Sequence, residues 1–425
     1  MSVFIRQLTG IRFVAAFWVL AYHLQGPFNV LGLLSIPILA DVMRVGRLGV
    51  DLFFALSGFI LTHTYLTRMG SGLHVKQTLK FWWLRLARIY PVHVVMLIIA
   101  GFAVFAQARV EGDSIDRDWW NPIDFTKNLL LIQEWGPNPE RGWNFVAWSL
   151  SMEWLAYLAF PFLVLVLWRL HTRVPTFVLG VAWIVVLAPL VGYGLGTNDP
   201  YYTDDWGSTY RIASEFTAGA ITYLIVQRLV DRGPGVERAA LWLSSLLPLA
   251  VVAGAVFLGW LPAAQPPVNA MNPDAEPLPP YFHLTLVPLL VAWIGALALA
   301  RGGMARALST RALILGGFIS YSLYMTHLVW MGLWRAGVNA AGIDGGPLYA
   351  ISVVGLVVGA LVIAWLMWKV VEEPAREWMR GLVGTRRTPT EEAGEALVEA
   401  EASAQGRTHP DDPIEPVQVP GDEGR

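Results

Sequence analysis

The sequence predicts an all-α protein, a polytopic transmembrane helix bundle of about ten spans with cytoplasmic N- and C-termini. Three observations predict this fold class. Of the 425 residues, 55% are hydrophobic and 15% are charged, and the mean hydropathy of +0.50 lies far above that of soluble domains. Apolar runs of membrane-spanning length recur along the chain, and basic residues gather in every second connection. The chain has no cysteine, which excludes disulfides, thiolate catalysis and Cys-ligated metals.

Ten apolar runs are long enough for a helix to cross a bilayer, which takes about 17 to 25 residues. The stretch 28–43 is apolar but shorter, and we expect it to be re-entrant or interfacial. The first run lacks a small-residue cleavage site, so we expect it to stay in the mature protein. The predicted spans are 8–25, 48–67, 90–108, 145–168, 176–195, 210–229, 240–260, 281–300, 313–334 and 348–370.

The distribution of Lys and Arg sets the orientation of these spans. The outer loops near 196–209 and 261–280 contain no basic residue, whereas basic residues recur in the alternate connections. Because cytoplasmic connections carry the excess of Lys and Arg, we expect a multi-pass protein of the inner (plasma) membrane with both ends in the cytoplasm. The predicted inner connections hold Arg68, Lys76, Lys80, Arg85, Arg88, Arg169, Arg173, Arg232, Arg238, Arg301, Arg306 and Arg311.

The chain divides into two predicted parts. Residues 1–375 form the transmembrane domain, and residues 376–425 form a cytoplasmic tail. From residue 388 on, the sequence is acidic, rich in proline and free of aromatic residues. Such a composition buries too little apolar surface to fold, so we expect a disordered tail. A segment that docks a partner is the alternative interpretation.

The first predicted span carries two polar residues, Arg12 and His23. Eleven residues at roughly 100° each make about three turns, so both side chains lie on one face, about 16 Å apart along the axis. A charged or titratable group at membrane depth is costly unless it faces a bundle interior or a water-filled cavity. We therefore expect this pair to be functional.

Polar residues of the other spans fall at two depths. On the inner side, Arg12 joins Arg85 and Arg88, which lie at i and i+3 and project together from a helix. Two arginines on one face form a fork for phosphate or carboxylate groups. Odd spans run outward and even spans run inward. Residues late in the odd spans and residues early in the even spans therefore meet in an outer layer. This layer contains His23, Asp51, Ser149, Ser151, Glu153, Arg211, Glu215 and His327.

Several of these residues, and Ser57 beside them, also have a purely structural interpretation. The arginine fork flanks a span, as cytoplasmic topology demands. On this interpretation, His327 forms a hydrogen bond between helices and has no further role. Asp51 and Glu153 can pair with Arg211 and hold the bundle together. Ser57 and the small residues beside it can simply allow close helix packing.

Six motifs follow one another from residue 8 to about 375. Together they resemble the acyltransferase-3 family of integral membrane proteins, which move acyl groups, most often acetyl, onto hydroxyls of sugars, polysaccharides, glycolipids or macrolides. The motifs are Arg12-x10-His23, "GVDLFFALSGFIL" (49–61), "RLARIYP" (85–91), "WSLSMEWLAYLAFP" (148–161), "ISYSLYMTH" (319–327) and "EEP" (372–374).

The resemblance implies an O-acyltransferase with acyl-CoA as donor, acetyl-CoA being the family default. It implies that Arg85 and Arg88 bind the phosphates of the donor. His23 is then the candidate base for the acceptor hydroxyl, and Arg12 steadies the donor or the developing negative charge. Whether His23 acts as a base or carries the acyl group itself stays open. We expect no metal cofactor and no nucleic-acid partner.

The acceptor is expected to be a carbohydrate or a glycosylated molecule. The outer polar layer suggests delivery from the external face, although the sequence leaves the side of the membrane open. The competing interpretations are a transporter with a polar path through the bundle and a non-catalytic scaffold, which leaves the two polar layers unexplained. The residues expected to bind or orient the acceptor are Asp51, Ser149, Glu153 and His327.

Overall fold

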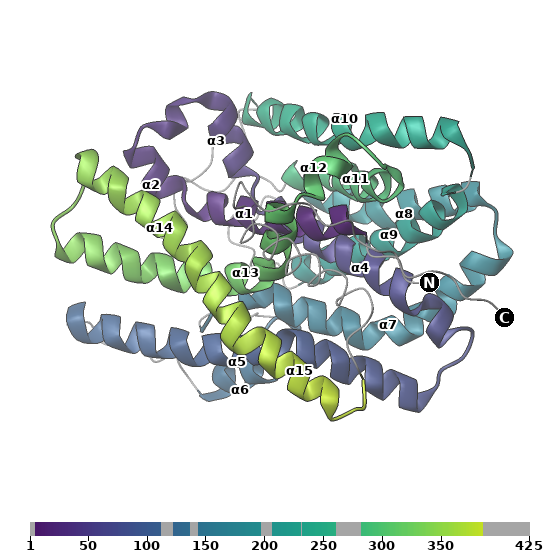
Figure 1. Ribbon diagram of the computed structural model, residues 1–425, viewed down its shortest axis with the longest axis horizontal. Helices are drawn as coiled ribbons and strands as arrows, with labels where there is room; N and C mark the ends of the chain where they lie inside the picture. The colour runs from purple at the N-terminus through teal and green to yellow at the C-terminus, as the bar shows by residue number, and fades with distance from the viewer. Residues whose placement is uncertain are drawn as a thin grey trace, which may run out of the picture.

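The computed structural model describes residues 5–111, 122–136, 143–196, 206–230, 232–260 and 282–385. Within these ranges the chain is helical and contains no β-strand. Figure 1 shows long helices arranged around α1, which runs through the middle of the molecule. In chain order the elements are α1 (Arg6–His23), α2 (Gln25–Val30), η1 (Leu33–Ser35), α3 (Pro37–Arg44), α4 (Leu48–Met69), α5 (Val75–Glu111), α6 (Pro122–Leu129), α7 (Ala147–Arg173), α8 (Thr176–Gly196), α9 (Gly207–Leu229), α10 (Pro234–Trp260), η3 (Phe282–Leu286), α11 (Val287–Leu299), α12 (Met304–Leu308), α13 (Arg311–Ala340), α14 (Gly346–Met367), η4 (Trp368–Glu372) and α15 (Glu373–Gly381).

Seven of the described helices are long and apolar enough to cross a membrane, namely α4, α5, α7, α8, α10, α13 and α14. This confirms the predicted all-α membrane bundle. The other three predicted spans fall on α1, α9 and the segment η3–α11. They are shorter or more polar than the seven: α1 has 18 residues with two arginines, and α11 has 13 residues. The total of ten spans and the cytoplasmic termini stay predictions.

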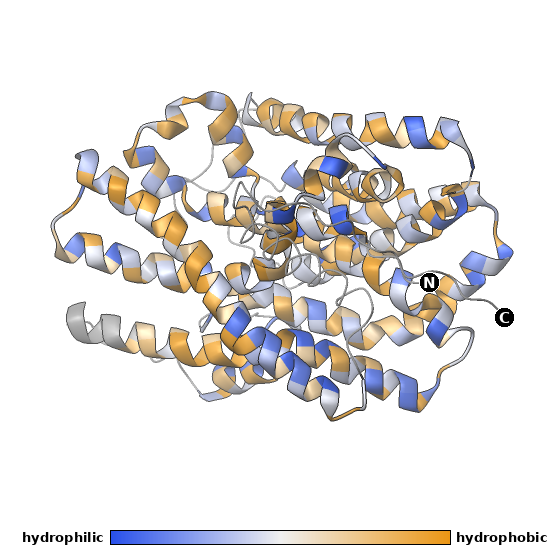
Figure 2. Cartoon of the chain, viewed as in Figure 1, coloured by the Kyte–Doolittle hydropathy of each residue, from blue (hydrophilic) through white to orange (hydrophobic). Residues whose placement is uncertain are grey.

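The bundle contains two kinds of helix. Over their most apolar stretches α4 and α13 are 67% and 61% buried, whereas α8, α10 and α14 are 22%, 17% and 22% buried. In Figure 2 the exposed helices α10 and α14 are mostly orange along their length. Helices that are apolar all round suit a lipid surface. The more buried α4 and α13 carry many of the polar residues discussed below.

Glycines allow the central helices to approach closely. α4 packs against α9, and α1 packs against α13. A Cβ atom on Gly58 would lie 1.9 Å from the Phe216 carbonyl oxygen, and one on Gly219 would lie 1.9 Å from the Ala55 carbonyl oxygen. Between α1 and α13, a Cβ on Gly317 would lie 2.1 Å from the Thr9 carbonyl oxygen. Small residues at helix crossings are the usual means of association in membranes.

The segment after α1 forms the short elements α2, η1 and α3. None of them is long enough to span a bilayer, in agreement with the expected interfacial or re-entrant piece at 28–43. Helix α3 packs against α10. A Cβ atom on Gly259 of α10 would lie 2.2 Å from the Asp41 carboxylate of α3, so the two helices approach closely at this glycine.

The C-terminal helices end close to α5. α14 continues through the π-helical turn η4 into α15. Trp83 of α5 donates a hydrogen bond from Nε1 to the Met379 carbonyl oxygen of α15, 2.7 Å away. α15 ends at Gly381, past the predicted domain boundary at 375. Most of the predicted tail, residues 386–425, lies outside the described residues.

Candidate functional site

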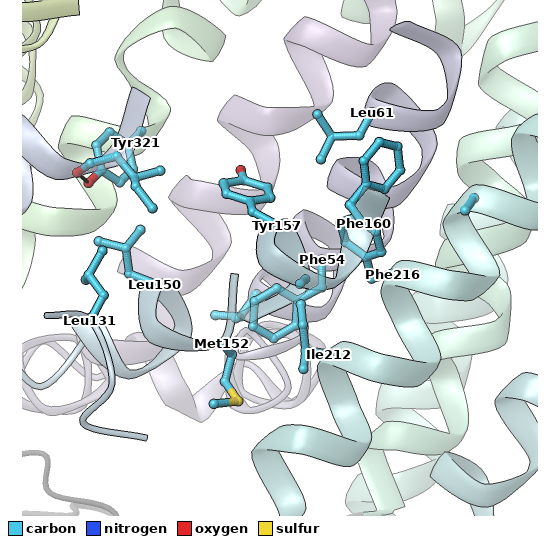
Figure 3. Packing of buried hydrophobic residues seen from close by; sticks show 14 of the residues in the cluster. Phe54, Leu61, Leu131, Leu150, Met152, Tyr157, Phe160, Ile212, Phe216 and Tyr321 are labelled. Carbon is cyan, nitrogen blue, oxygen red and sulfur yellow. Dashed lines mark hydrogen bonds between the residues drawn. The ribbon is translucent and has the colours of Figure 1, made fainter. Parts of the chain in front are cut away.

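A cavity of about 100 Å³ lies between α1, α4, α5, α7 and α13. We call it the arginine cavity because three arginines line it. Figure 3 shows two of its tyrosines, Tyr157 and Tyr321, within a cluster of buried hydrophobic residues. Phe54, Leu61 and Leu150 of this cluster also line the cavity. Its polar and aromatic lining consists of Arg12, Phe53, Phe54, Ser57, Arg85, Arg88, Ser149, Glu153, Tyr157, Tyr321 and Tyr324.

Helix periodicity brings these side chains together. Arg85 and Arg88 are three residues apart on α5, and Glu153 and Tyr157 are four apart on α7, so each pair lies on one face of its helix. Arg12 enters from α1. The structure thus brings the three predicted inner arginines into one cavity, and it adds Glu153, which the sequence places in the outer layer.

Glu153 is held by two hydroxyls. Ser57 Oγ donates to Glu153 Oε1 over 2.8 Å, and the Tyr157 hydroxyl donates to the same oxygen. Ser57 therefore has a side-chain contact in addition to the close packing beside it. Because Glu153 lies in the cavity, its negative charge offsets part of the positive charge of the arginines.

Arg88 forms an ion pair with Glu372, the first residue of the "EEP" motif. Ser322 Oγ donates to the other oxygen of Glu372 over 2.7 Å. The Arg88 guanidinium also lies over the ring of Tyr321, 5.5 Å from its centre. Next to this ion pair, Arg376 pairs with Glu373 within α15. The C-terminal segment thus supplies the counter-charge for one of the three arginines.

The other two arginines rest against aromatic rings. Arg85 lies over Tyr65 and Tyr157, 5.7 and 6.0 Å from the ring centres. Arg12 lies over Phe53, 5.9 Å from the ring centre. Arg12 makes no hydrogen bond or ion pair to any residue in the described ranges, and its Nε atom is buried. No carboxylate of the described residues pairs directly with Arg12, so only the Phe53 ring and the charge of Glu153 elsewhere in the cavity offset its positive charge.

His23 and His327 contact each other and form what we call the histidine pair. His327 Nε2 lies 3.2 Å from His23 Nδ1, and the ring centres are 5.0 Å apart. Neither histidine is among the residues that line the arginine cavity. Tyr324 connects the two places, since it lines the cavity and its ring centre lies 6.0 Å from that of His327. Phe53 packs on Tyr324 at the same cavity wall, with ring centres 6.4 Å apart.

Asp51 has a different partner. Its Oδ1 atom accepts hydrogen bonds from Arg211 Nε at 2.9 Å and from a terminal nitrogen of Arg211 at 2.8 Å. Both side chains are fully buried, and the Arg211 guanidinium lies 4.9 Å from the ring centre of Trp148. Glu215, one turn further along α9, is also fully buried. Asp51 thus shows the pairing with Arg211 that the sequence left open as a structural role.

The two serines of the outer layer are also separated. Ser149 lines the arginine cavity and lies 2.7 Å from the Tyr324 hydroxyl. Ser151 donates to the Leu131 carbonyl oxygen over 2.8 Å and accepts from the Glu134 backbone N–H over 3.3 Å. The single layer expected from the sequence is therefore divided between the cavity, the histidine pair and contacts that hold loops and helices together.

Sequence reasoning missed the aromatic wall of the cavity and Glu372, the acidic partner of Arg88. Tyr157 lies four residues after Glu153, and Tyr321 and Tyr324 belong to the quoted "ISYSLYMTH" motif, so helical spacing could have found them. Glu372 begins the "EEP" motif, but the motif alone does not indicate its ion pair with Arg88. Phe53 lies within the 49–61 motif, but its residue type gives no further signal, because a phenylalanine in an apolar span is ordinary.

The fold and this site define a helical membrane protein whose buried polar groups converge on a cation-lined cavity and a nearby histidine pair. Such a site is typical of membrane proteins that bind or convert a charged substrate. The chain belongs to the acyltransferase-3 family, whose acyltransferase domain matches residues 5–369. The family match confirms the predicted activity class, an acyltransferase.

Two curated relatives agree with this class. Acyltransferase MdmB of Streptomyces mycarofaciens is 30% identical over 346 residues, which are 76% of this chain and 78% of that protein. Peptidoglycan O-acetyltransferase OatA of Listeria monocytogenes is 28% identical over 176 residues, which are 38% of this chain and 24% of that protein. No solved structure matches the chain.

Proposed function

We propose that the protein transfers an acyl group, acetyl in the first instance, from acyl-CoA to a hydroxyl of a sugar, polysaccharide, glycolipid or macrolide-type acceptor. One observation supports the choice of donor. Arg12 is a cation inside a helical membrane bundle, it lines a cavity, and no carboxylate of the described residues pairs with it. A cation without a direct ion pair at membrane depth is costly, so an anionic ligand that reaches the cavity is favoured.

The cavity suits a phosphate-bearing donor. Arg12, Arg85 and Arg88 bring three positive charges to its wall, and guanidinium groups bind phosphate oxygens in a bidentate manner. Its volume of about 100 Å³ is below the 300–1,000 Å³ typical of ligand pockets. The cavity therefore takes part of the donor, and the remainder of the CoA extends toward the cytoplasm, where acyl-CoA is made.

His23 is the residue that we assign to the acyl-transfer step. As a base, it takes the proton from the acceptor hydroxyl while the hydroxyl oxygen attacks the thioester carbonyl. The new C–O ester bond forms, the C–S bond breaks, and the thiolate leaves with the electron pair. The proton then passes from His23 to the thiolate sulfur. Acyl-CoA and the hydroxyl thus become CoA and an ester with no other reactant.

The acceptor approaches from the side of the histidine pair. His23 does not line the arginine cavity, so the acyl end of the donor has to pass Phe53 and Tyr324 to reach it. We place the protein in the inner (plasma) membrane with the donor on the cytoplasmic side and the acceptor on the opposite side. The peptidoglycan in the name of the Listeria relative supports an acceptor of carbohydrate type.

The test is transfer of label from radioactive acetyl-CoA into glycan, lipid and small-molecule fractions, using membranes with wild type, His23→Ala or His74→Ala. His74 is an exposed histidine outside the site and serves as the matched control. We expect label in one fraction with wild type and His74→Ala, and a loss of about 100- to 10,000-fold with His23→Ala. Equal labelling by His23→Ala would refute the assignment of His23.

The competing class is a transporter with a polar path through the bundle. A transporter has no reason to release CoA from acetyl-CoA. Purified protein in detergent, given acetyl-CoA and the fraction that takes up label, is expected to release free CoA in step with acceptor labelling. Absence of both products with folded protein would favour the transporter.

A further inference from the structure

The contact within the histidine pair joins a buried ring to a partly exposed one. His327 of α13 is 1% exposed, whereas His23 at the end of α1 retains some exposure. The hydrogen positions on both rings can be worked out from their neighbours, because a carbonyl oxygen can only accept a hydrogen bond. These positions decide which nitrogen of His23 is available to a substrate.

The proton of His327 lies on Nδ1. This atom is 2.7 Å from the Tyr324 carbonyl oxygen and 3.2 Å from the Leu323 carbonyl oxygen, so it must be the donor. In a neutral ring the other nitrogen, Nε2, then carries a lone pair. No acidic side chain within the described ranges contacts His327, and a buried imidazolium without such a partner is costly. His327 Nε2 is therefore an acceptor facing His23.

The same reasoning places the proton of His23 on Nδ1. That atom faces two acceptors, the Val19 carbonyl oxygen at 2.9 Å and His327 Nε2 at 3.2 Å. An unprotonated Nδ1 would meet only lone pairs, so it carries a hydrogen that both acceptors share. In the neutral ring Nε2 of His23 then keeps its lone pair, and no N–H or O–H group in the described part of the chain donates a hydrogen bond to it.

We propose that His327 is a positioning residue that holds His23 in the tautomer whose Nε2 is the base. This rests on the proposed function, in which His23 takes the proton of the acceptor hydroxyl. After that step the His23 imidazolium still donates its Nδ1–H to His327 and to Val19. A neutral histidine thus fills the orienting position that a carboxylate holds in a Ser-His-Asp triad, without a further negative charge at membrane depth.

The test compares His327→Gln with His327→Leu in the acceptor-labelling assay. The Gln amide oxygen can lie where Nε2 lies and accept from His23, whereas Leu fills similar volume without an acceptor. We expect His327→Leu to lower kcat by about 100-fold with the KM for acetyl-CoA within about twofold of wild type. Activity of His327→Gln is expected to recover to within about tenfold of wild type. Thr326→Val is the control, since its buried hydroxyl bonds only to its own helix at Ser322.

A spectroscopic measurement makes the proposal independent of how well the variants fold. In full-length protein with ¹⁵N-labelled histidine, signals lost in His23→Ala are expected to report a protonated Nδ1 and an unprotonated Nε2. The opposite tautomer would overturn the proposal. With His23→Ala inactive, two kinetic results would also overturn it. One is a wild-type kcat for His327→Leu, and the other is a His327→Gln variant as inactive as folded His327→Leu. Full activity of His23→Ala would instead refute the proposed function.

Discussion

Two arginines lie inside this bundle in opposite circumstances. Arg211 is fully buried, donates twice to Asp51 and lies over Trp148. Arg12 lies over Phe53 at the wall of a cavity, and no acid of the described chain pairs with it. The first charge is satisfied within the protein and the second is not. This difference favours a structural role for the Arg211–Asp51 pair, and it is the basis on which we propose that Arg12 binds a ligand.

The largest expected effect comes from removing the partner of the paired arginine. Asp51→Ala leaves Arg211 as a buried charge without its acceptor, which costs about 3–5 kcal/mol of folding free energy. We expect a strongly lowered unfolding midpoint in detergent and little protein in the membrane. The measurement is thermal unfolding followed by retention on a size-exclusion column. A midpoint within 2 °C of wild type would contradict a structural role for the pair.

Removing both partners sharpens the same point. Asp51→Leu combined with Arg211→Met replaces the ion pair by apolar side chains, and such replacements of buried pairs are often neutral or stabilising. We therefore expect the double variant to regain most of the stability that Asp51→Ala loses. Retained acetyl transfer in this variant would show that Asp51 is dispensable for acceptor binding, while a stable but inactive protein would restore the acceptor role that the sequence suggested.

For the unpaired arginine the expected effects are reversed. Arg12→Gln removes a costly charge, so the unfolding midpoint is expected to stay equal or rise. Loss of one charge-assisted contact of about 1.5–3 kcal/mol raises the Kd for acyl-CoA roughly 10- to 150-fold. Equilibrium binding of radiolabelled CoA measures the change, with Arg68→Gln, outside the cavity, as the matched control. An unchanged Kd would remove Arg12 from the donor site.

An intermediate case is Arg88, which faces the cavity but pairs with Glu372. Glu372→Gln keeps the shape and removes the counter-charge, so we expect about 1–3 kcal/mol lower stability and several-fold tighter CoA binding. Ser322→Ala removes only a neutral hydroxyl from the same carboxylate and is expected to change CoA binding less than twofold. Weaker CoA binding by folded Glu372→Gln would mean that Glu372 itself positions the donor.

The smallest effect is expected for Ser57→Ala. Glu153 keeps its hydrogen bond from Tyr157 when the Ser57 hydroxyl is lost, so the cost is about 0.5–1.5 kcal/mol of stability and a change of less than threefold in CoA binding. A loss as large as that of Arg12→Gln would place Ser57 in direct contact with the donor.

The fold was predictable where composition and spacing carry the signal. Long apolar runs with few charges gave helices such as α8 and α14, because a lipid-facing helix is apolar all round. The bounds of α1, α9 and α11, and hence the number of spans, were less predictable. These helices are short or contain polar residues, which the helices packed around them accommodate. Nothing in their own sequences states how much of their surface neighbouring helices cover.

The site was predictable on single helices and less so between them. The i, i+3 spacing of Arg85 and Arg88 and the shared face of Arg12 and His23 follow from helix geometry. The partner of Glu153 depends on how α4 and α7 are rotated about their axes, and that rotation is fixed by packing at crossings such as Gly58 with Phe216. Depth alone therefore grouped Glu153 with His23, Asp51 and His327, whereas it lines the cavity together with the three inner arginines.

The π-helical turn Trp368–Glu372 sets the rotational phase of the helix that follows it. A turn with one extra residue shifts every later side chain by about 100° around the axis, and in this phase Glu372 meets Arg88. A one-residue deletion between 368 and 371 would leave the apolar α14 intact yet turn Glu372 and Glu373 away from α5. The number of residues in this turn is therefore constrained more tightly than the identity of the residues that form it.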